Sequence, residues 1–177
     1  MRTKNFLNMM AMMFERCGVN KGLLPVKGRD GVTYYVGPSS PGNSSGWPYS
    51  GTYTVQSSAT SAGLCIGSGT TAATEDDYDL AAQIMSGFSS STVANASLDN
   101  DGNPTVTFDL TITNTGSSAI TVAEVGMKQM LYTTTAENGT SFSTRLFLLD
   151  RTVLSEPVTI AAGEYAVIRY ILKTDIT

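Results

Sequence analysis

The feature that most constrains the fold is a strict alternation of apolar and polar side chains in residues 105–113. Four apolar residues occupy every second position of this segment: Val106, Phe108, Leu110 and Ile112. Successive side chains of a β-strand point to opposite faces, so a period of two predicts a strand with one buried face and one wet face. This is the clearest strand signal in the chain.

Short apolar runs separated by Gly, Pro, Asn, Asp and Ser continue through the rest of the chain after residue 20. Turn signals recur about every ten residues, which is the spacing of an all-β sandwich. Ser and Thr make up about a quarter of the 177 residues and only 15% are charged, a bias that suits exposed strand faces. We therefore expect an all-β fold over residues 21–177, an antiparallel β-sandwich with jelly-roll or immunoglobulin-like connectivity. The further expected strands are residues 23–27, 32–36, 53–56, 64–66, 92–98, 119–127, 143–149, 158–160 and 164–173.

Three turns are expected to close hairpins between these strands. Residues 28–31 contain two glycines, which tolerate positive φ, between the first two expected strands. The turn at 114–117 joins 105–113 to 119–127 as an antiparallel pair. Residues 99–103 start like a calcium-binding EF-hand loop, but Pro104 stands where that loop needs glycine and its last ligand is missing. A hairpin turn is the simpler interpretation.

Composition excludes several classes of function. The chain has no histidine, so the commonest general base and metal ligand is missing, and its serines have no base to activate them. We expect no enzyme. A net charge of −4 provides no positive field that would attract nucleic acid, so nucleic acid is not expected as a partner. No apolar stretch reaches the roughly 20 residues of a membrane span, so a membrane is not expected as a partner either. Cys17 and Cys65 form no CxxC pair and are expected to be reduced, partly buried thiols.

Residues 1–20 are expected to form a separate N-terminal arm. Their start imitates a signal peptide, but Asn8 interrupts the apolar run and a cleavage site of small residues is missing, so no signal peptide is expected. The spacing predicts a short amphipathic helix with Thr3 as a candidate cap and Gly18 as its stop. The residues of its apolar face are Phe6, Leu7, Met9, Met10, Met13, Phe14 and Cys17. Such a methionine-rich face has to be covered, either by its own domain or by a partner chain.

The last expected strand, residues 164–173, is apolar on both faces, unlike a sandwich strand with a wet outer side. One face carries Ala166, Ile168, Tyr170 and Leu172, and the other carries Tyr165, Val167 and Ile171. Either the arm or a neighbouring subunit covers the second face, and we favour the neighbour. The chain is therefore expected to be a homo-oligomer. The candidate residues of its assembly interface are Phe6, Met10, Met13, Phe14, Tyr165, Val167 and Ile171.

Residues 37–51 form a long expected loop with three prolines. Loops of this length inside a compact domain are often functional or lie on a neighbour, although a merely flexible loop is the more frequent case. Aromatic residues anchor many binding surfaces, so Trp47, Tyr49 and Tyr53 are candidate contacts to a host surface receptor.

Two further segments invite a ligand-binding interpretation that we do not favour. Residues 75–79 gather four carboxylates, enough for calcium, but they also fit a helix start capped by Thr74, which we prefer. Residues 67–71 (GSGTT) follow an apolar strand as a phosphate-binding loop does, yet no lysine comes after them. No metal and no cofactor are therefore expected.

Three segments carry a family resemblance. Residues 65–84 (CIGSGTTAATEDDYDLAAQI) resemble a segment of tailed-bacteriophage virion structural proteins, in which IGxGTTxPTxDDYxLxxxI is followed by β-strands. Residues 111–126 (TITNTGSSAITVAEVG) resemble the NTGxxxITVxEVG hairpin of the same proteins. Residues 148–164 resemble their LLxRxVL…PVTxxxGE ending. Ala73 departs from the pattern, since proline is commonest there.

The resemblance implies a non-enzymatic structural subunit of a bacteriophage particle. Such a subunit would be made in the host cytoplasm, would reside in the virion and would have other virion proteins as partners. It would be tail-associated, in the neck, at the tail tip or linked to a fibre, or it would be a capsid decoration or head fibre. The alternative is a receptor- or glycan-binding module acting in host attachment, and a third hypothesis is a secreted adhesin-like domain.

Overall fold

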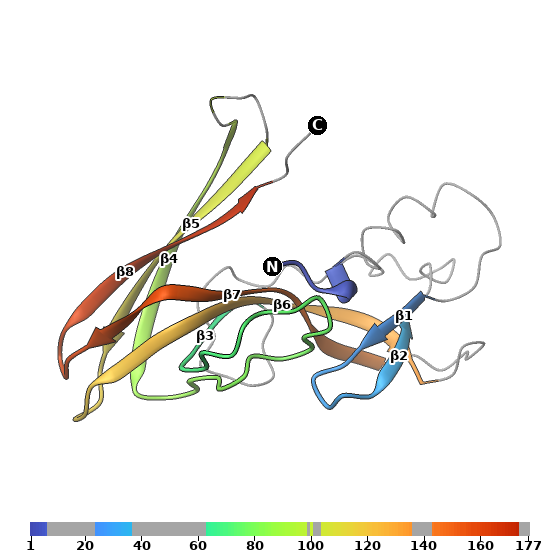
Figure 1. The fold of residues 1–177 in the computed structure, drawn as a ribbon, viewed down its shortest axis with the longest axis horizontal. Coiled ribbons are helices and arrows are strands. Elements are labelled where there is room, and N and C mark those ends of the chain that lie inside the picture. The colour runs from blue at the N-terminus through green and yellow to red at the C-terminus, as the bar shows by residue number, and fades with distance from the viewer. Residues whose placement is uncertain (7–23, 37–62, 99, 101–103, 136–142, 174–177) are drawn as a thin grey trace.

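A computed structural model describes residues 1–6, 24–36, 63–98, 100, 104–135 and 143–173 of the chain (Figure 1). These residues are mostly β-strand with a single helical turn at residues 4–6. The strands are β1 (Leu24–Lys27), β2 (Thr33–Val36), β3 (Gly63–Gly67), β4 (Phe88–Leu98), β5 (Pro104–Asn114), β6 (Ile120–Thr134), β7 (Ser143–Ile160) and β8 (Tyr165–Lys173). The expected all-β class is confirmed.

The strands form two antiparallel sheets. In the larger sheet β6 is the spine, because β7 pairs along one of its sides while β3 and the β1–β2 hairpin pair along the other. The second sheet has the order β4-β5-β8. The connections from β3 to β4, from β5 to β6 and from β7 to β8 each cross from one sheet to the other.

One apolar core lies between the two sheets. Strand alternation selects its members, and the period-two residues of β5 supply three of them, all almost fully buried. The cluster is Leu64, Ile66, Phe108, Leu110, Ile112, Val122, Val125, Ile160, Ile168 and Tyr170. The expected inner face of 105–113 is therefore confirmed.

Two of the three expected hairpins occur. The third prediction is wrong: residues 105–113 and 119–127 do not pair, because β5 and β6 belong to different sheets and the turn at 114–117 carries the chain from one sheet to the other. The β1–β2 turn is closed by the amide of Gly31 donating to the carbonyl of Gly28 (2.8 Å), and Gly31 has φ of 75°, a conformation that glycine adopts without strain. β4 and β5 pair without interruption from Phe88 opposite Asn114 to Leu98 opposite Pro104. The hairpin around residues 99–103 is thus confirmed.

The sequence failed to predict that residues 143–160 form one continuous strand. The expected strands 143–149 and 158–160 are its two ends, joined by residues 150–157, which include Pro157. In the structure β6 and β7 change register between Val122 and Glu124, so residues 154–157 lie in a β-bulge without ladder partners. Proline is accommodated at this irregular point, and β7 continues through it instead of ending.

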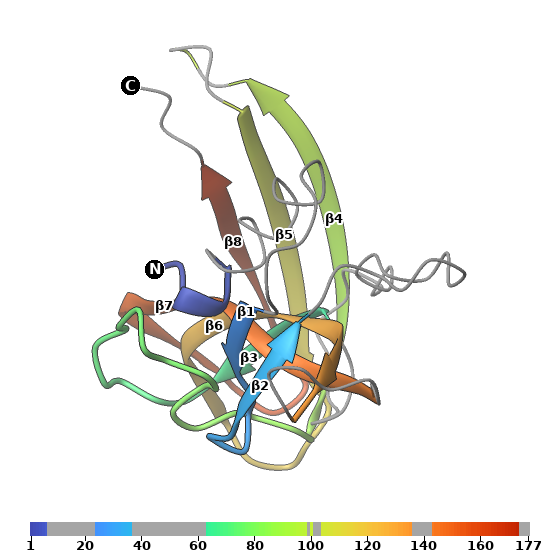
Figure 2. The same ribbon diagram turned by 90° about the vertical axis from the view of Figure 1, so that its right-hand side faces the viewer.

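The three-stranded sheet extends beyond the larger one. Figures 1 and 2 both show the far ends of β4, β5 and β8 rising away from the other strands. Burial along β4 agrees, because its residues alternate between half-buried and exposed as far as Thr92, whereas residues 93–98 are all exposed. Among the described residues, no second layer therefore covers the second half of β4.

The first residues of the chain lie along β7. The amide of Thr3 donates to Leu149 (3.0 Å), and the amide of Arg151 donates to the carbonyl of Met1 (3.0 Å). The hydroxyl of Thr3 donates to Leu148 (2.8 Å), so Thr3 anchors this segment on β7. Residues 7–20 of the expected arm, including most of its helix, lie outside the described residues.

Candidate functional site

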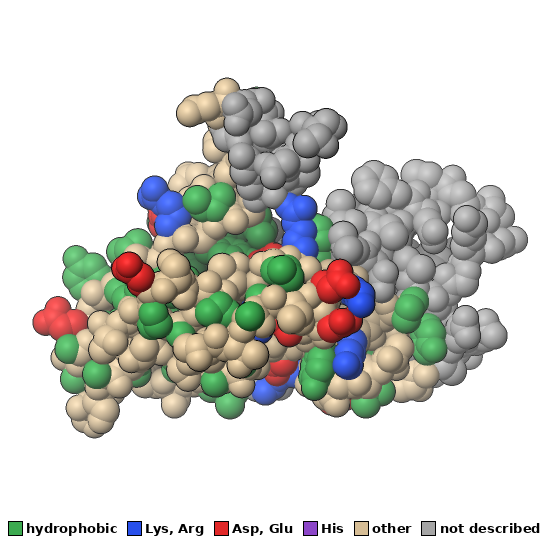
Figure 3. Space-filling view, viewed as in Figure 1, with side chains coloured by type: hydrophobic (Ala, Val, Ile, Leu, Met, Phe, Trp, Pro, Cys, Tyr) green, Lys and Arg blue, Asp and Glu red, His purple; other side chains and the backbone are tan. Residues whose placement is uncertain are grey.

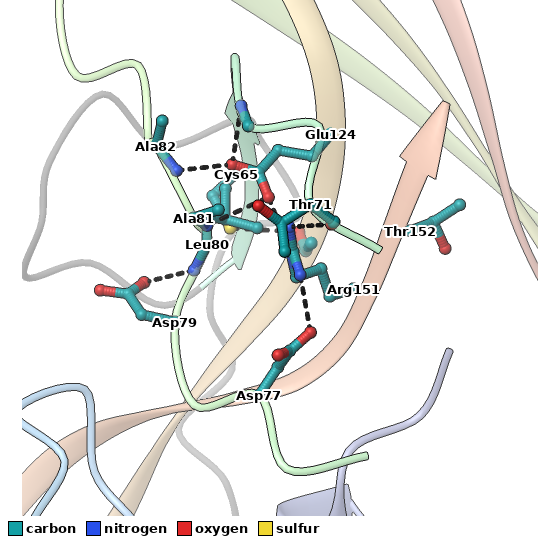
Figure 4. A network of polar contacts seen from close by, with 12 residues as sticks. Cys65, Thr71, Asp77, Asp79, Leu80, Ala81, Ala82, Glu124, Arg151 and Thr152 are labelled. Carbon is teal, nitrogen blue, oxygen red and sulfur yellow. Dashed lines mark hydrogen bonds and ion pairs between the residues drawn. The ribbon is translucent and has the colours of Figure 1, made fainter. Parts of the chain in front are cut away.

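The most unusual feature of the core region is the buried carboxylate of Glu124 on β6. The side chain is completely buried and accepts hydrogen bonds from the backbone amides of Gly69 (3.2 Å), Ala81 (3.1 Å) and Ala82 (2.8 Å), as Figure 4 shows. A buried carboxylate requires such donors, because an unpaired one would cost several kcal/mol. Residues 67–84 are therefore folded around Glu124, and their amides bind an internal anion instead of a phosphate.

Arg151 on β7 completes this site from the other side. Its guanidinium is almost fully buried and donates to Glu124 (Nε to Oε2, 2.7 Å), to Asp77 (Nη1 to Oδ2, 2.7 Å) and to the carbonyl of Thr71 (Nη2, 2.8 Å). The planar fork of arginine suits several directed bonds of this kind. Arg151 thus fastens residues 67–84 at two points to the paired strands β6 and β7 (Figure 4).

Asp77 belongs to a turn, which corrects the expected helix start at Thr74. The amide and the hydroxyl of Thr74 both donate to the Asp77 carboxylate (2.9 Å each), and no helix follows in the described residues 75–98. Aspartate side chains can accept hydrogen bonds from nearby backbone amides and so favour a turn over a helix. The Asp77 carboxylate does this with Thr74. Burial raises the pKa of Asp77, but the bonds from Thr74 and Arg151 outweigh burial and hold that pKa below its usual value.

The other three carboxylates of the acidic cluster also have cationic partners within the chain. Lys4 contacts both Glu75 (3.3 Å) and Asp76 (2.7 Å) at the surface. Asp79 binds Arg29 (2.5 Å) and the buried ammonium group of Lys128. Figure 3 shows acidic and basic side chains side by side on this face. The cluster is therefore part of the fold's internal charge pairing.

Gly67 is required where residues 67–84 leave β3. A Cβ atom there would lie 2.6 Å from the carbonyl oxygen of Ala82 and would also overlap the carboxylate of Glu124. The close approach lets the amide of Ser68 donate to Ala82 (2.8 Å) and the amide of Ile84 donate to Ile66 (2.9 Å). Residues 82–84 consequently cover the side of β3 that faces away from β6.

Tyr170 connects the two sheets through a polar contact inside the core. Its hydroxyl on β8 donates to the carboxylate of Asp150 on β7, and both side chains are buried. Burial, followed by the neighbouring Asp150 charge, raises the pKa of Tyr170. The phenol therefore remains a hydrogen-bond donor at physiological pH.

The expected outer face of the last strand is exposed. Tyr165, Val167 and Ile171 on β8 expose 67%, 57% and 52% of their surface, and Val93 on β4 exposes 61% on the same face. The alternate residues of β8 point into the core. The three interface candidates at the end of the chain therefore share one uncovered side of the β4-β5-β8 sheet.

The remaining candidates from the sequence are mostly outside the described residues. Phe6 is half-buried and lies 5.2 Å from the guanidinium of Arg2. The expected loop 37–51 and strand 53–56 fall in an undescribed part of the chain. The candidate residues found there or in the arm are Met10, Met13, Phe14, Trp47, Tyr49 and Tyr53.

The pairing of Glu124 with Arg151 was not predicted from the sequence. A signal existed, since Glu124 interrupts the apolar run of β6 and Arg151 follows a run of apolar residues in β7. Charged residues are rarely fully buried unless they are paired, so two charges in buried strands indicate a partner. The sequence does not reveal which residue that partner is, because the two residues are 27 positions apart.

Comparison with protein-family models, with curated proteins and with solved structures finds no match for this chain. Within the described ranges, no helix is long and apolar enough to cross a membrane. The same residues contain no group of three or more His, Cys, Asp or Glu side chains that could hold a metal ion.

The thiol of Cys65 is expected to be unreactive in the folded protein. It is 1% exposed, it donates to the carbonyl of Gly126 (3.3 Å), and burial raises its pKa to about 12. A buried thiol without thiolate character is a poor nucleophile. In a Cys17→Ser chain at pH 8, a thiol-reactive dye should modify no cysteine before denaturation and one afterwards. Rapid modification of the native variant would contradict the buried position of Cys65.

Proposed function

We propose that this chain is a non-enzymatic structural subunit of a bacteriophage particle. It would be tail-associated, in the neck, at the tail tip or next to a fibre, or it would be a capsid decoration or head fibre. Its partners would be other virion proteins and further copies of itself. The observation that carries an assembly role is the row of exposed apolar side chains on β8, Tyr165, Val167 and Ile171. Exposed apolar side chains gathered on one strand are typical of a protein interface.

The positions of the resemblance motifs support the phage proposal. The segment 65–84, the β6 segment that contains Glu124 and the β7 segment that contains Arg151 meet in one network. The motif residues that contact each other there have a structural role, because they hold residues 67–84 on the strands. A motif shared for this reason points to a common fold.

We further propose that the two sheets form a β-sandwich of the Greek-key type. Three of the connections between strands cross from sheet to sheet, which occurs in both the jelly-roll and the immunoglobulin-like arrangement. The short N-terminal amphipathic helix belongs to this proposal as well, as a second assembly element.

The assembly role can be tested by placing charges on the exposed face of β8. We expect a Val167→Asp/Ile171→Asp chain to self-associate at least about tenfold more weakly than wild type, or about 1.4 kcal/mol, because carboxylates would have to be desolvated in the interface. The measurement is the mass in solution by light scattering across a concentration series. A Thr121→Asp/Thr159→Asp chain carries the same charge on the other sheet and should associate as wild type does.

The phage assignment has its own test. Particles purified from cells infected by the phage that encodes this chain should contain it as a structural component, identified by mass spectrometry. Particles made with the Val167→Asp/Ile171→Asp chain should contain much less of it. Wild-type particles that lack the chain would overturn the assignment.

A further inference from the structure

The outer face of the β4-β5-β8 sheet carries two opposite charges side by side near its middle. The register places Val93, Asp109 and Arg169 in one row across the three strands. The guanidinium of Arg169 donates to both oxygens of Asp109, from Nε (2.7 Å) and from Nη2 (3.2 Å), and the arginine side chain is exposed. Its third nitrogen, Nη1, takes part in neither bond and remains able to donate.

Exposed apolar side chains lie on both sides of this charge pair along β8. Val167 comes two residues before Arg169 and Ile171 comes two residues after it, so the three side chains point to the same face. More than half of the surface of Val167 and of Ile171 is exposed. The row of apolar side chains on β8 is thus interrupted once, at a charge that has its counter-charge beside it on β5.

We propose that this face binds the same face of a second copy of the chain. The two-fold axis would run parallel to the strands, midway between β5 and β8, so that Arg169 of each copy lies over Asp109 of the other. This inference rests on the proposed function, because it names the partner of the assembly surface on β8.

The arrangement of the charges identifies a second copy as the occupant. In a two-fold interface the same patch contacts itself, so its charges must be self-complementary. An axis midway between β5 and β8 exchanges the positions of Asp109 and Arg169, and four charges then alternate in sign around the axis. Each carboxylate lies between two guanidinium groups, so no charge is desolvated without a partner. The pair itself is neutral, whereas the whole chain carries a net charge of −4 that would make two copies repel each other elsewhere.

The same axis gives the exposed residues of β8 an apolar neighbour. Rotation about a line parallel to the strands leaves every residue at its own level, so Val167 meets Val167 of the other copy and Ile171 meets Ile171. Two sheets pack face to face about 10 Å apart, which brings such side chains into contact. Burial of their apolar surface favours association. β4 lies outside the overlap, because the axis runs on the other side of β5.

Reversing the charges tests the two-fold pairing. Arg169→Glu brings four carboxylates together in the dimer and Asp109→Lys brings four cations together, so each variant should self-associate at least about tenfold more weakly than wild type. An equimolar mixture of the two variants should form a dimer, because the carboxylates of one chain then face the cations of the other. The measurement is the mass in solution by light scattering, for each variant and for the mixture, across one concentration series. Unchanged circular dichroism spectra verify that both variants are folded.

Two matched substitutions test the position of the axis. Val93 and Val167 are the same residue type on the same face, with 61% and 57% of their surface exposed. Val167→Ser should weaken self-association at least about threefold, since a two-fold interface loses the buried apolar surface twice. Val93→Ser should associate as wild type does, because β4 lies outside the overlap. The stability of Arg169 variants is compared at concentrations at which the chain is monomeric, since dimerisation also stabilises the fold.

The outcomes separate this inference from the proposed function. Loss of the dimer in both charge variants and its return in their mixture support the inference, even where phage particles lack the chain and the phage proposal fails. A wild type that stays monomeric, or charge variants that associate as wild type does, overturn it. Self-association that is lost in Val167→Asp/Ile171→Asp but does not return in the mixture also overturns it, while it still supports assembly through β8.

Discussion

Replacing Arg151 with alanine is expected to lower the free energy of unfolding by about 3–5 kcal/mol, the cost of leaving one partner of a buried ion pair alone. The substitution leaves Glu124 with three amide donors but no opposite charge, and it frees Asp77 and the carbonyl of Thr71. Residues 67–84 would lose the hydrogen bonds that join Asp77 and Thr71 to β7. Chemical denaturation at one fixed protein concentration measures the change, since self-association also stabilises the folded state.

Arg169→Ala is the matched control for this prediction. Arg169 makes a similar pair with Asp109 (2.7 Å), but its side chain is 66% exposed on the outer face of β8. Exposed ion pairs contribute about 0–1 kcal/mol, so this variant should unfold close to wild type. Equal losses for Arg151→Ala and Arg169→Ala would show that burial of the Glu124 pair has no energetic importance.

The loss at Arg151 should also depend on pH. The pKa of Asp77 is lowered in the folded chain, so its contribution to stability is present above the ordinary aspartate pKa and is lost as the pH falls through the lowered value. Below about pH 4, where unfolded aspartate becomes protonated, wild type loses this contribution. The Arg151→Ala variant has already lost part of the contribution of Asp77. The difference in free energy of unfolding between wild type and this variant should therefore become smaller in acid.

Local patterns of the sequence were enough to predict most strands, but not the contacts that join them. The alternation in 105–113 predicts β5 and its inner face because strand periodicity is a property of neighbouring residues. The same holds for the outward position of Tyr165 and Val167. The continuity of β7 was not predicted, since the local sequence does not reveal that the strand passes through a bulge at residues 154–157.

The buried network was beyond prediction for a related reason. The acidic run 75–79 has the local chemistry of a helix start, and cations distant in the sequence, such as Arg151 and Lys128, turn it into a charge-paired loop. Such pairs join residues far apart in the sequence, and the spacing of residues does not predict which strands become neighbours. The order β4-β5-β8 was equally hidden, since the order of strands in a sheet depends on pairings between distant residues.

The second large effect is expected at Asn114, where the turn after β5 meets the turn before β8. Its side chain is completely buried; Nδ2 donates to the carbonyls of Ser118 (2.8 Å) and Ile160 (2.9 Å), and Oδ1 accepts from the amide of Gly116 (2.9 Å). Asn114→Asp has nearly the same shape but replaces the donor with a carboxylate oxygen. Two carbonyl oxygens would then face a buried negative charge, and we expect a loss of about 3 kcal/mol or more at pH 7.

Lowering the pH should restore part of the stability of the Asn114→Asp chain. A variant that only removes a contact should show no such recovery. Burial and the two carbonyls disfavour the charged form, so the pKa of the new carboxyl group is raised in the folded state, and stability increases as the pH falls toward about 4. The protonated group can again donate one hydrogen bond to Ile160 or Ser118. Asn114→Ala should lose stability without this pH dependence, and Asn100→Asp, at an exposed turn, should stay within about 0.5 kcal/mol of wild type. If Asn114→Asp unfolds at the same denaturant concentration as wild type at pH 7, the amide does not hold the two turns together.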